Sequence, residues 1–131
     1  MAKLIQAIGA YGPRIKLGLT AGLEELTRFI AGRTGLNEGS ILLVLKELRD
    51  AVVFFHLAGR SVKMEGLGIY TPSIDLPGVF DVGHRLDPRL RDELNKPNAF
   101  KGEIVNNDMV GKTSGDLKTR WNEEHPEDPI P

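Results

Sequence analysis

The feature that most constrains the fold is a stretch of about twenty residues, 37–57, with the pattern of one long helix. Asn37 is a good N-terminal cap, and Gly59 can supply the left-handed residue that ends a helix. Apolar side chains recur at helical spacing over more than half of its girth: Ile41, Leu42, Leu43, Val44, Leu45, Leu48, Ala51, Val52, Val53, Phe54 and Phe55. Such a helix is rarely a surface helix of a small monomer. We therefore expect it to be buried on several sides, partly by another subunit.

The segments around this helix predict a small α+β domain. A shorter helix capped by Thr20 precedes it, with apolar residues again at helical spacing. A strand over 61–74 follows, in which Gly66 and Gly68 suggest a bulge or a close backbone contact. The turn Leu76-Pro77-Gly78 leads to a second strand over 79–86. Asp87 and Pro88 then start a short helix, because Asp caps well and Pro fits the first helical position.

The two ends of the chain are predicted as extensions of this domain, over residues 1–19 and 96–131, which leaves the domain itself at 20–95. Strand-like pieces around 3–8 and 14–19 flank a turn at Tyr11-Gly12-Pro13. The C-terminal extension consists of a strand in AFKGEIV, a loop, a short helix and an acidic tail. That strand could extend the sheet of the domain, and the tail could cover one of its faces.

Composition limits the class of protein. With 131 residues and 40% hydrophobic side chains, the chain suits one domain with an appendage. It contains no cysteine, which excludes disulfides and cysteine-based metal sites. No signal peptide pattern and no membrane-spanning apolar stretch is present, so we expect a cytoplasmic protein. The net charge of −1 lacks the large basic excess of a simple DNA-coating protein.

No constellation of residues favours an enzyme, a metal site or a cofactor. His56, His84 and His125 are far apart and lack the spacing of metal ligands. Adjacent carboxylates such as Glu24-Glu25 fall on expected helix surfaces, where they are solvated far more often than catalytic. We therefore expect no enzyme activity and no cofactor.

Basic residues cluster near the second strand and the short helix after it. Arg85, Arg89 and Arg91 lie there, Lys63 lies on the partner strand, and Arg60 comes just before that strand. An arginine can hold a phosphate through two hydrogen bonds. The alternative is that these arginines pair with the nearby carboxylates of Asp87, Asp92 and Glu93, and the residues alone leave both interpretations open.

The order of these elements resembles the HU/IHF family of bacterial DNA-bending proteins. The resemblance covers about residues 20–95, and residues 26–70 and 84–94 carry it. The most specific part is GLGIY, which looks like the family's G-F-G-x-F turn at the base of its arm, at the family's distance from the long helix. RLDPRLRDEL is similar to the family's terminal R/K-P-x-x-x-L-K segment.

The resemblance implies an intertwined homodimer whose long helices share one core, with Leu45, Leu48, Val52 and Phe55 in its centre. It also implies a nucleoid protein whose strands form a saddle that meets DNA. In the family, two long arms wrap the minor groove and a proline at each tip wedges between base pairs. Arg85 and Arg91 match basic positions of the family's last segment, whereas Arg89 has no matching role.

The chain departs from the family at the arm. About thirty residues form the arm in the family, whereas only TPSIDLPG stands between the two strands here. Asp75 and Asp81 place negative charge where the family is positive, and Leu86 and Asp87 replace its Pro and Gly.

Two hypotheses follow. The first is a DNA-binding dimer that contacts phosphates weakly, without sequence preference and without long arms. The second is a dimeric structural or protein-interaction module that has kept the fold and lost DNA binding.

Overall fold

The structure, a computed structural model, describes residues 2–131. These residues form helices and small antiparallel sheets, so the predicted α+β class is confirmed. The chain divides into two compact units. Thr20–Phe100 make up the first, which we call the central unit, and the described residues up to Leu19 together with Lys101–Pro131 make up the second, the terminal unit.

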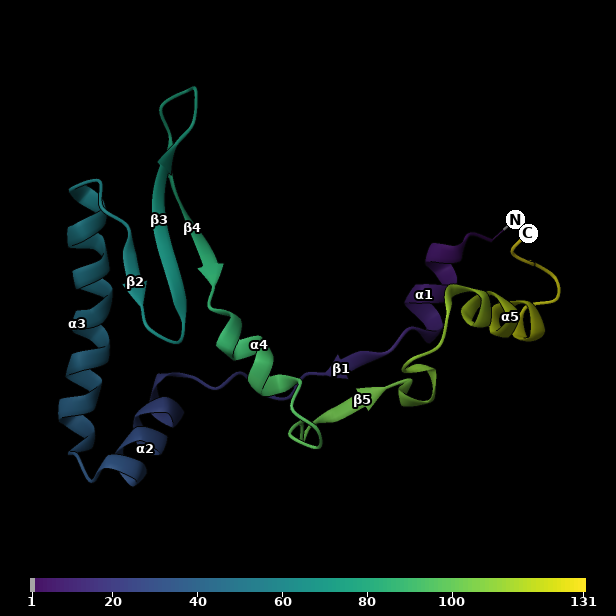
Figure 1. Ribbon diagram of the computed structural model, residues 1–131, viewed down its shortest axis with the longest axis horizontal. Coiled ribbons are helices and arrows are strands. Elements are labelled where there is room, and N and C mark those ends of the chain that lie inside the picture. The colour runs from purple at the N-terminus through teal and green to yellow at the C-terminus, as the bar shows by residue number, and fades with distance from the viewer. Residues whose placement is uncertain (1) are drawn as a thin grey trace. The chain divides into compact units, whose positions relative to one another are not determined.

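The central unit places two helices beside a three-stranded sheet (Figure 1). Helices α2 (Leu23–Thr34) and α3 (Glu38–Leu57) pack against each other, and α3 also contacts the first strand of the sheet. Strands β2 (Val62–Met64), β3 (Gly68–Ile74) and β4 (Phe80–Leu86) are antiparallel in the order β2-β3-β4. The short helix α4 (Pro88–Leu94) follows directly after β4.

The ends of the helices follow from local capping. The Asn37 side chain accepts hydrogen bonds from Gly39 N and Ser40 N, and Gly59 adopts a left-handed φ of 75°, both as predicted. The predicted cap at Thr20 is wrong, because α2 begins three residues later with Gly22 as its cap. Its first turn holds Glu24 and Glu25, whose charges suit the positive end of a helix dipole.

The single strand predicted over 61–74 is wrong, because it is two strands joined by a tight turn. Gly66, with φ 81°, lies in this turn, and Leu67 N donates to Met64 O at 3.0 Å. Two smaller predictions are confirmed. Gly68 makes a close backbone contact, and residues 76–78 turn the chain between β3 and β4.

The terminal unit brings the two ends of the chain together. Helix α1 (Leu4–Tyr11) packs on α5 (Ser114–Glu124), and β1 (Arg14–Lys16) pairs antiparallel with β5 (Glu103–Val105). A short 3-10 helix, η1 (Asn107–Met109), follows β5. The predicted strand at 3–8 is therefore wrong. The predicted extension of the three-stranded sheet by AFKGEIV is also wrong, since β5 pairs with β1.

A compact apolar core holds the terminal unit. Ala2, Ala7, Trp121 and Ile130 are buried together, and Leu4, Tyr11 and Leu117 pack against them. The stretch that follows α5 folds back onto that helix. Trp121 Nε1 donates to Asp128 O at 2.8 Å, and the Asn122 side chain exchanges two hydrogen bonds with the backbone of Ile130. Helix α1 is thus helical because Leu4, Ala7 and Tyr11 share one face that this core covers.

Among the described residues, no helix is both long and apolar enough to cross a membrane.

Candidate nucleic-acid interface

The strand register brings two of the candidate basic residues into one row. Lys63 of β2 pairs with Ile69 of β3, which pairs with Arg85 of β4. Directly paired residues of neighbouring strands point to the same face of a sheet. Lys63 and Arg85 therefore lie on one face, with Ile69 between them.

That face points away from the long helix. The opposite face of the sheet carries Met64, Tyr70 and Val82, because these residues occupy the alternate positions along the strands. They line an open groove together with α3 residues such as Val52 and Val53. The groove has a volume of about 370 Å³ and is largely apolar. The sheet thus has an inner face toward α3 and an outer face that carries the Lys63–Ile69–Arg85 row.

Gly68 fixes the backbone of β4 at Arg85. Its φ of 145° is in a region that side chains rarely adopt, and a Cβ atom there would overlap the carbonyl oxygen of Arg85. The same atom would lie 2.6 Å from Nε2 of His84, whose ring packs on Tyr70 with 4.5 Å between ring centroids. This close approach of two strands explains the second glycine of GLGIY.

Asp87 joins the sheet to α4. One carboxylate oxygen accepts from Arg89 N at 2.9 Å and caps the helix, as predicted, while the other accepts from Gly66 N at 3.2 Å. The backbone N–H of Asp87 also donates to Leu67 O at 3.0 Å. The start of α4 is therefore tied to the β2–β3 turn, which sets the positions of Arg89 and Arg91.

The basic side chains differ in their surroundings. Arg89 lies 3.9 Å from the carboxylate of Glu65, and both side chains are well exposed, so the pair is weak. Arg60 places its guanidinium over the Phe55 ring, 5.1 Å from the centroid, so it is drawn toward α3 and away from the row. Within residues 2–131, no carboxylate lies within ion-pair distance of Lys63, Arg85 or Arg91.

Two of the three carboxylates proposed as alternative partners of the arginines have other contacts, and Asp92 forms no ion pair with an arginine within residues 2–131. Asp87 caps α4, and Glu93 pairs with Lys96 at 2.8 Å. The partner that Arg89 does have, Glu65, lies 24 positions earlier in the chain and gives no local sequence signal.

The β3–β4 hairpin ends in a three-residue turn. Asp75 N donates to Val79 O at 3.0 Å, Val79 N donates to the Asp75 carboxylate at 2.8 Å, and Gly78 adopts φ 94°. The strands pair as far as Ile74 and Phe80. The hairpin therefore extends six residues beyond Ile69, or about 20 Å, which is about one duplex width and too short to encircle DNA.

The tip of this hairpin is apolar, a feature that was not predicted from the sequence. Leu76 is fully exposed, and Ile74, Val79 and Phe80 are 60%, 62% and 77% exposed. Exposed apolar groups gathered at one place mark an interaction surface. The high apolar content of IDLPGVF at a turn is the sequence signal for it.

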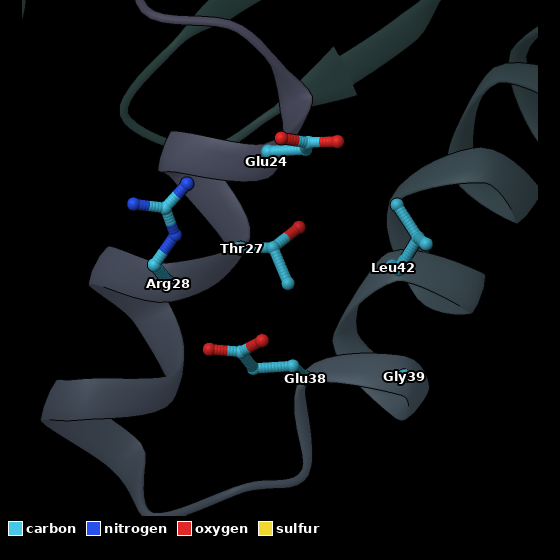
Figure 2. Close-up of a pocket in the computed structure, with 6 residues that line it drawn as sticks. All are labelled: Glu24, Thr27, Arg28, Glu38, Gly39 and Leu42. Carbon is cyan, nitrogen blue, oxygen red and sulfur yellow. The ribbon is translucent and has the colours of Figure 1, made fainter.

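A second hollow lies between α2 and α3 (Figure 2). Figure 2 shows Glu24, Arg28 and Glu38 around Thr27, with Leu42 on the opposite wall, and the volume is about 320 Å³. Thr27 is buried and its hydroxyl donates to Leu23 O at 2.7 Å, so it is satisfied within its own helix. The hollow brings charged groups of both signs to the helix junction, and among residues 2–131 no acidic or basic side chain is hydrogen-bonded to the Thr27 hydroxyl to activate it.

The groups with shifted pKa values lie in the terminal unit. The hydroxyl of Tyr11 donates to the Glu124 carboxylate at 2.6 Å, which raises the pKa of Tyr11 and lowers the pKa of Glu124. Thr113 caps α5 through its hydrogen bonds with Asp116, which lower the pKa of that carboxyl. No group of His, Asp and Glu side chains between residues 2 and 131 is arranged to hold a metal ion.

Comparison with known families matches residues 9–86 to a model described as an HU domain fused to a wHTH, Ig or glycine-rich motif. The match covers more than half of the chain and includes Lys63 and Arg85, whereas Arg89 and Arg91 lie beyond its end. No curated protein matches the chain. This match, together with the long helix and the hairpin that has Gly68 at its base, shows that the chain belongs to the family of HU domains fused to wHTH, Ig or glycine-rich motifs.

Proposed function

We propose that the chain forms a nucleoid-associated HU-like homodimer that contacts the phosphate backbone of DNA without long minor-groove arms. The family is typically DNA-binding and non-enzymatic. The observation that carries the proposal is the outer-face row, in which Lys63 and Arg85 lie on either side of Ile69 without an ion pair inside the described chain. A nucleoid location within the cytoplasm accompanies this function.

The apolar side chains that remain partly exposed in the central unit support the homodimer. Leu48 is 39% exposed, and its predicted neighbours in the dimer core, Leu45, Val52 and Phe55, are only half-buried. Apolar grooves remain open beside them, one lined by Ile30, Leu36, Ile41, Val44 and Leu45 among others. Covering these side chains contributes about 25 cal/mol per Å² of apolar surface. A second copy that inserts its own long helix would provide that cover.

The phosphate contacts are assigned first to Lys63, Arg85 and Arg91, whose charges are uncompensated within the described residues. Arg89 follows, because DNA must compete with Glu65 for it, and Arg60 comes last because it rests on Phe55. Each phosphate contact releases about one counterion from duplex DNA. So few contacts predict weak, sequence-independent binding whose affinity falls only gently as salt rises.

The alternative is an HU-fold dimer that serves as a protein-interaction module and no longer binds DNA. The apolar tip of the hairpin is the observation in its favour, together with Asp75 and Asp81 beside that tip. This alternative predicts no DNA binding at physiological salt.

Fluorescence anisotropy with a labelled 30-base-pair duplex at two salt concentrations tests the proposal. We expect binding that weakens with salt and that Arg85→Glu combined with Arg91→Glu abolishes. The matched control is Arg28→Glu combined with Arg33→Glu on α2, which changes the net charge equally. Unchanged binding by the Arg85/Arg91 variant would exclude this surface, and no binding by the unaltered protein at low salt would favour the interaction module.

A further inference from the structure

The charge on the outer face of the sheet changes from positive to negative between the base and the tip of the hairpin. Lys63 and Arg85 lie at the base of the hairpin. Asp81 pairs with Ser73 on the same face, and Asp75 lies opposite Val79 one step nearer the tip. Counted along β3 from Ile69, these acidic positions lie about 13 and about 20 Å from the basic row.

The charges of the two aspartates are not neutralised locally. Asp75 accepts a hydrogen bond from Val79 N, and Asp81 accepts one from Val82 N, both at 2.8 Å. The sequence has no Lys or Arg between Lys63 and Arg85. Over the described residues, no basic side chain forms an ion pair with either aspartate. The tip therefore presents two uncompensated negative charges on the face that carries the basic row.

A duplex on this face would meet both signs of charge. Duplex DNA is about 20 Å wide, which is close to the distance from the basic row to the tip. When one phosphate backbone lies on Lys63 and Arg85, the opposite backbone comes near the carboxylates. Phosphates near a carboxylate are repelled, by about 1 kcal/mol at 4 Å in water and by less at longer range or in salt.

We propose that Asp75 and Asp81 confine bound DNA to the base of the hairpin, so that the outer face engages one phosphate backbone and excludes the other. This inference rests on the proposed DNA-binding function. The two aspartates then determine how much of the duplex the protein covers, while the basic row determines whether it binds at all.

Removing the two charges tests this. Asp75→Asn combined with Asp81→Asn keeps a side-chain oxygen for each hydrogen bond to the backbone and removes only the charge. We expect about tenfold tighter binding of a 30-base-pair duplex at low salt. We also expect a steeper dependence of affinity on salt, because more phosphates are then contacted. Asp81→Asn alone should give part of the gain, and circular dichroism verifies that the sheet is retained.

The matched control is Glu47→Gln combined with Asp50→Asn on α3, which removes the same charge from the helix on the other side of the sheet. It should tighten binding less than twofold. If the unaltered protein binds DNA and the Asp75/Asp81 variant binds no tighter than this control, the inference fails while the proposed function stands. If neither the protein nor the variant binds, both fail. Binding by the variant alone would contradict both, because the aspartates would then prevent DNA binding in the natural chain instead of limiting how much of the duplex it covers.

Discussion

The two units of the molecule use apolar residues in opposite ways. In the terminal unit, Ala7 is fully buried, and Trp121 and Ile130 are 9% and 7% exposed. In the central unit, only Thr27, Ile41 and Gly68 are buried among residues 20–100, although α3 is its most apolar element. The terminal unit closes its core by joining the two ends of one chain. The central unit leaves its helix uncovered, so we infer that it needs a second chain.

The largest expected effect comes from Val52→Asp in α3. We expect a charge at the centre of the proposed shared core to unfold the central unit and not to release a folded monomer, at a cost of about 4 kcal/mol or more. The terminal unit should survive. Its state can be followed separately, because Trp121 is the only tryptophan in the chain and lies in its core.

Far-UV circular dichroism should therefore lose the helical signal of the central unit, while Trp121 fluorescence keeps its folded emission. Glu47→Asp introduces the same side chain elsewhere on α3 and should leave both signals unchanged. Loss of the tryptophan signal together with the helical signal would mean that the two units fold as one.

A smaller effect is expected within the sheet of the central unit. Gly68→Ala forces a side chain into a left-handed conformation against the carbonyl of Arg85, which costs about 2–4 kcal/mol. The comparison is Gly83→Ala, where the nearest atom to the new Cβ is Thr71 O at 3.9 Å. Denaturant titration followed by circular dichroism should show a large loss for the first variant and little for the second. Equal stability of the two variants would contradict the close approach of β3 and β4.

The smallest effect is the pH dependence of the terminal unit. Hydrogen bonds lower the pKa values of Asp116 and Glu124 in the folded state. Both carboxylates therefore stabilise the fold when the pH is above their pKa values in the unfolded chain. This stabilisation is lost as the pH falls through their pKa values in the folded state. Tyr11 has a raised pKa, so its contribution is present below its unfolded pKa and is lost as pH rises through the folded value.

The midpoint temperature of thermal unfolding, followed by Trp121 fluorescence, should therefore stay constant from about pH 5 to about pH 9 and decrease at lower and at higher pH. Tyr11→Phe should remove the alkaline fall and lessen the acidic one. An unaltered alkaline fall in that variant would show that another group is responsible.

Local signals in the sequence predicted much of the central unit. Asn37, Gly59 and the Asp87-Pro88 pair specify helix ends through their own side chains and backbone preferences, and the long apolar helix between the first two was correctly placed. The turn at Gly66 was missed because GLGIY also fits a continuous strand with a bulge. Once that turn and the turn at 76–78 fix the register of the three strands, strand alternation places Lys63 and Arg85 on one face.

Contacts between distant segments were less predictable. Arg14 pairs with Val105, and α1 is covered by α5, so neither local pattern reveals that the two ends form one unit. The eight-residue segment of α1 contains two isoleucines, which favour a strand, and Gly9, which disfavours a helix, and only its packing on Trp121 explains the helix. The pairing of Arg89 with Glu65 likewise depends on the tertiary fold.

The central claim is that a second copy of the chain covers the apolar surface of the central unit, whereas the terminal unit closes its own core. The mass of the protein in solution tests this claim most directly. Light scattering behind gel filtration should give about twice the chain mass of 14.4 kDa. A folded, monodisperse species at 14.4 kDa would contradict the account, because the apolar surface of α3 would then have no cover.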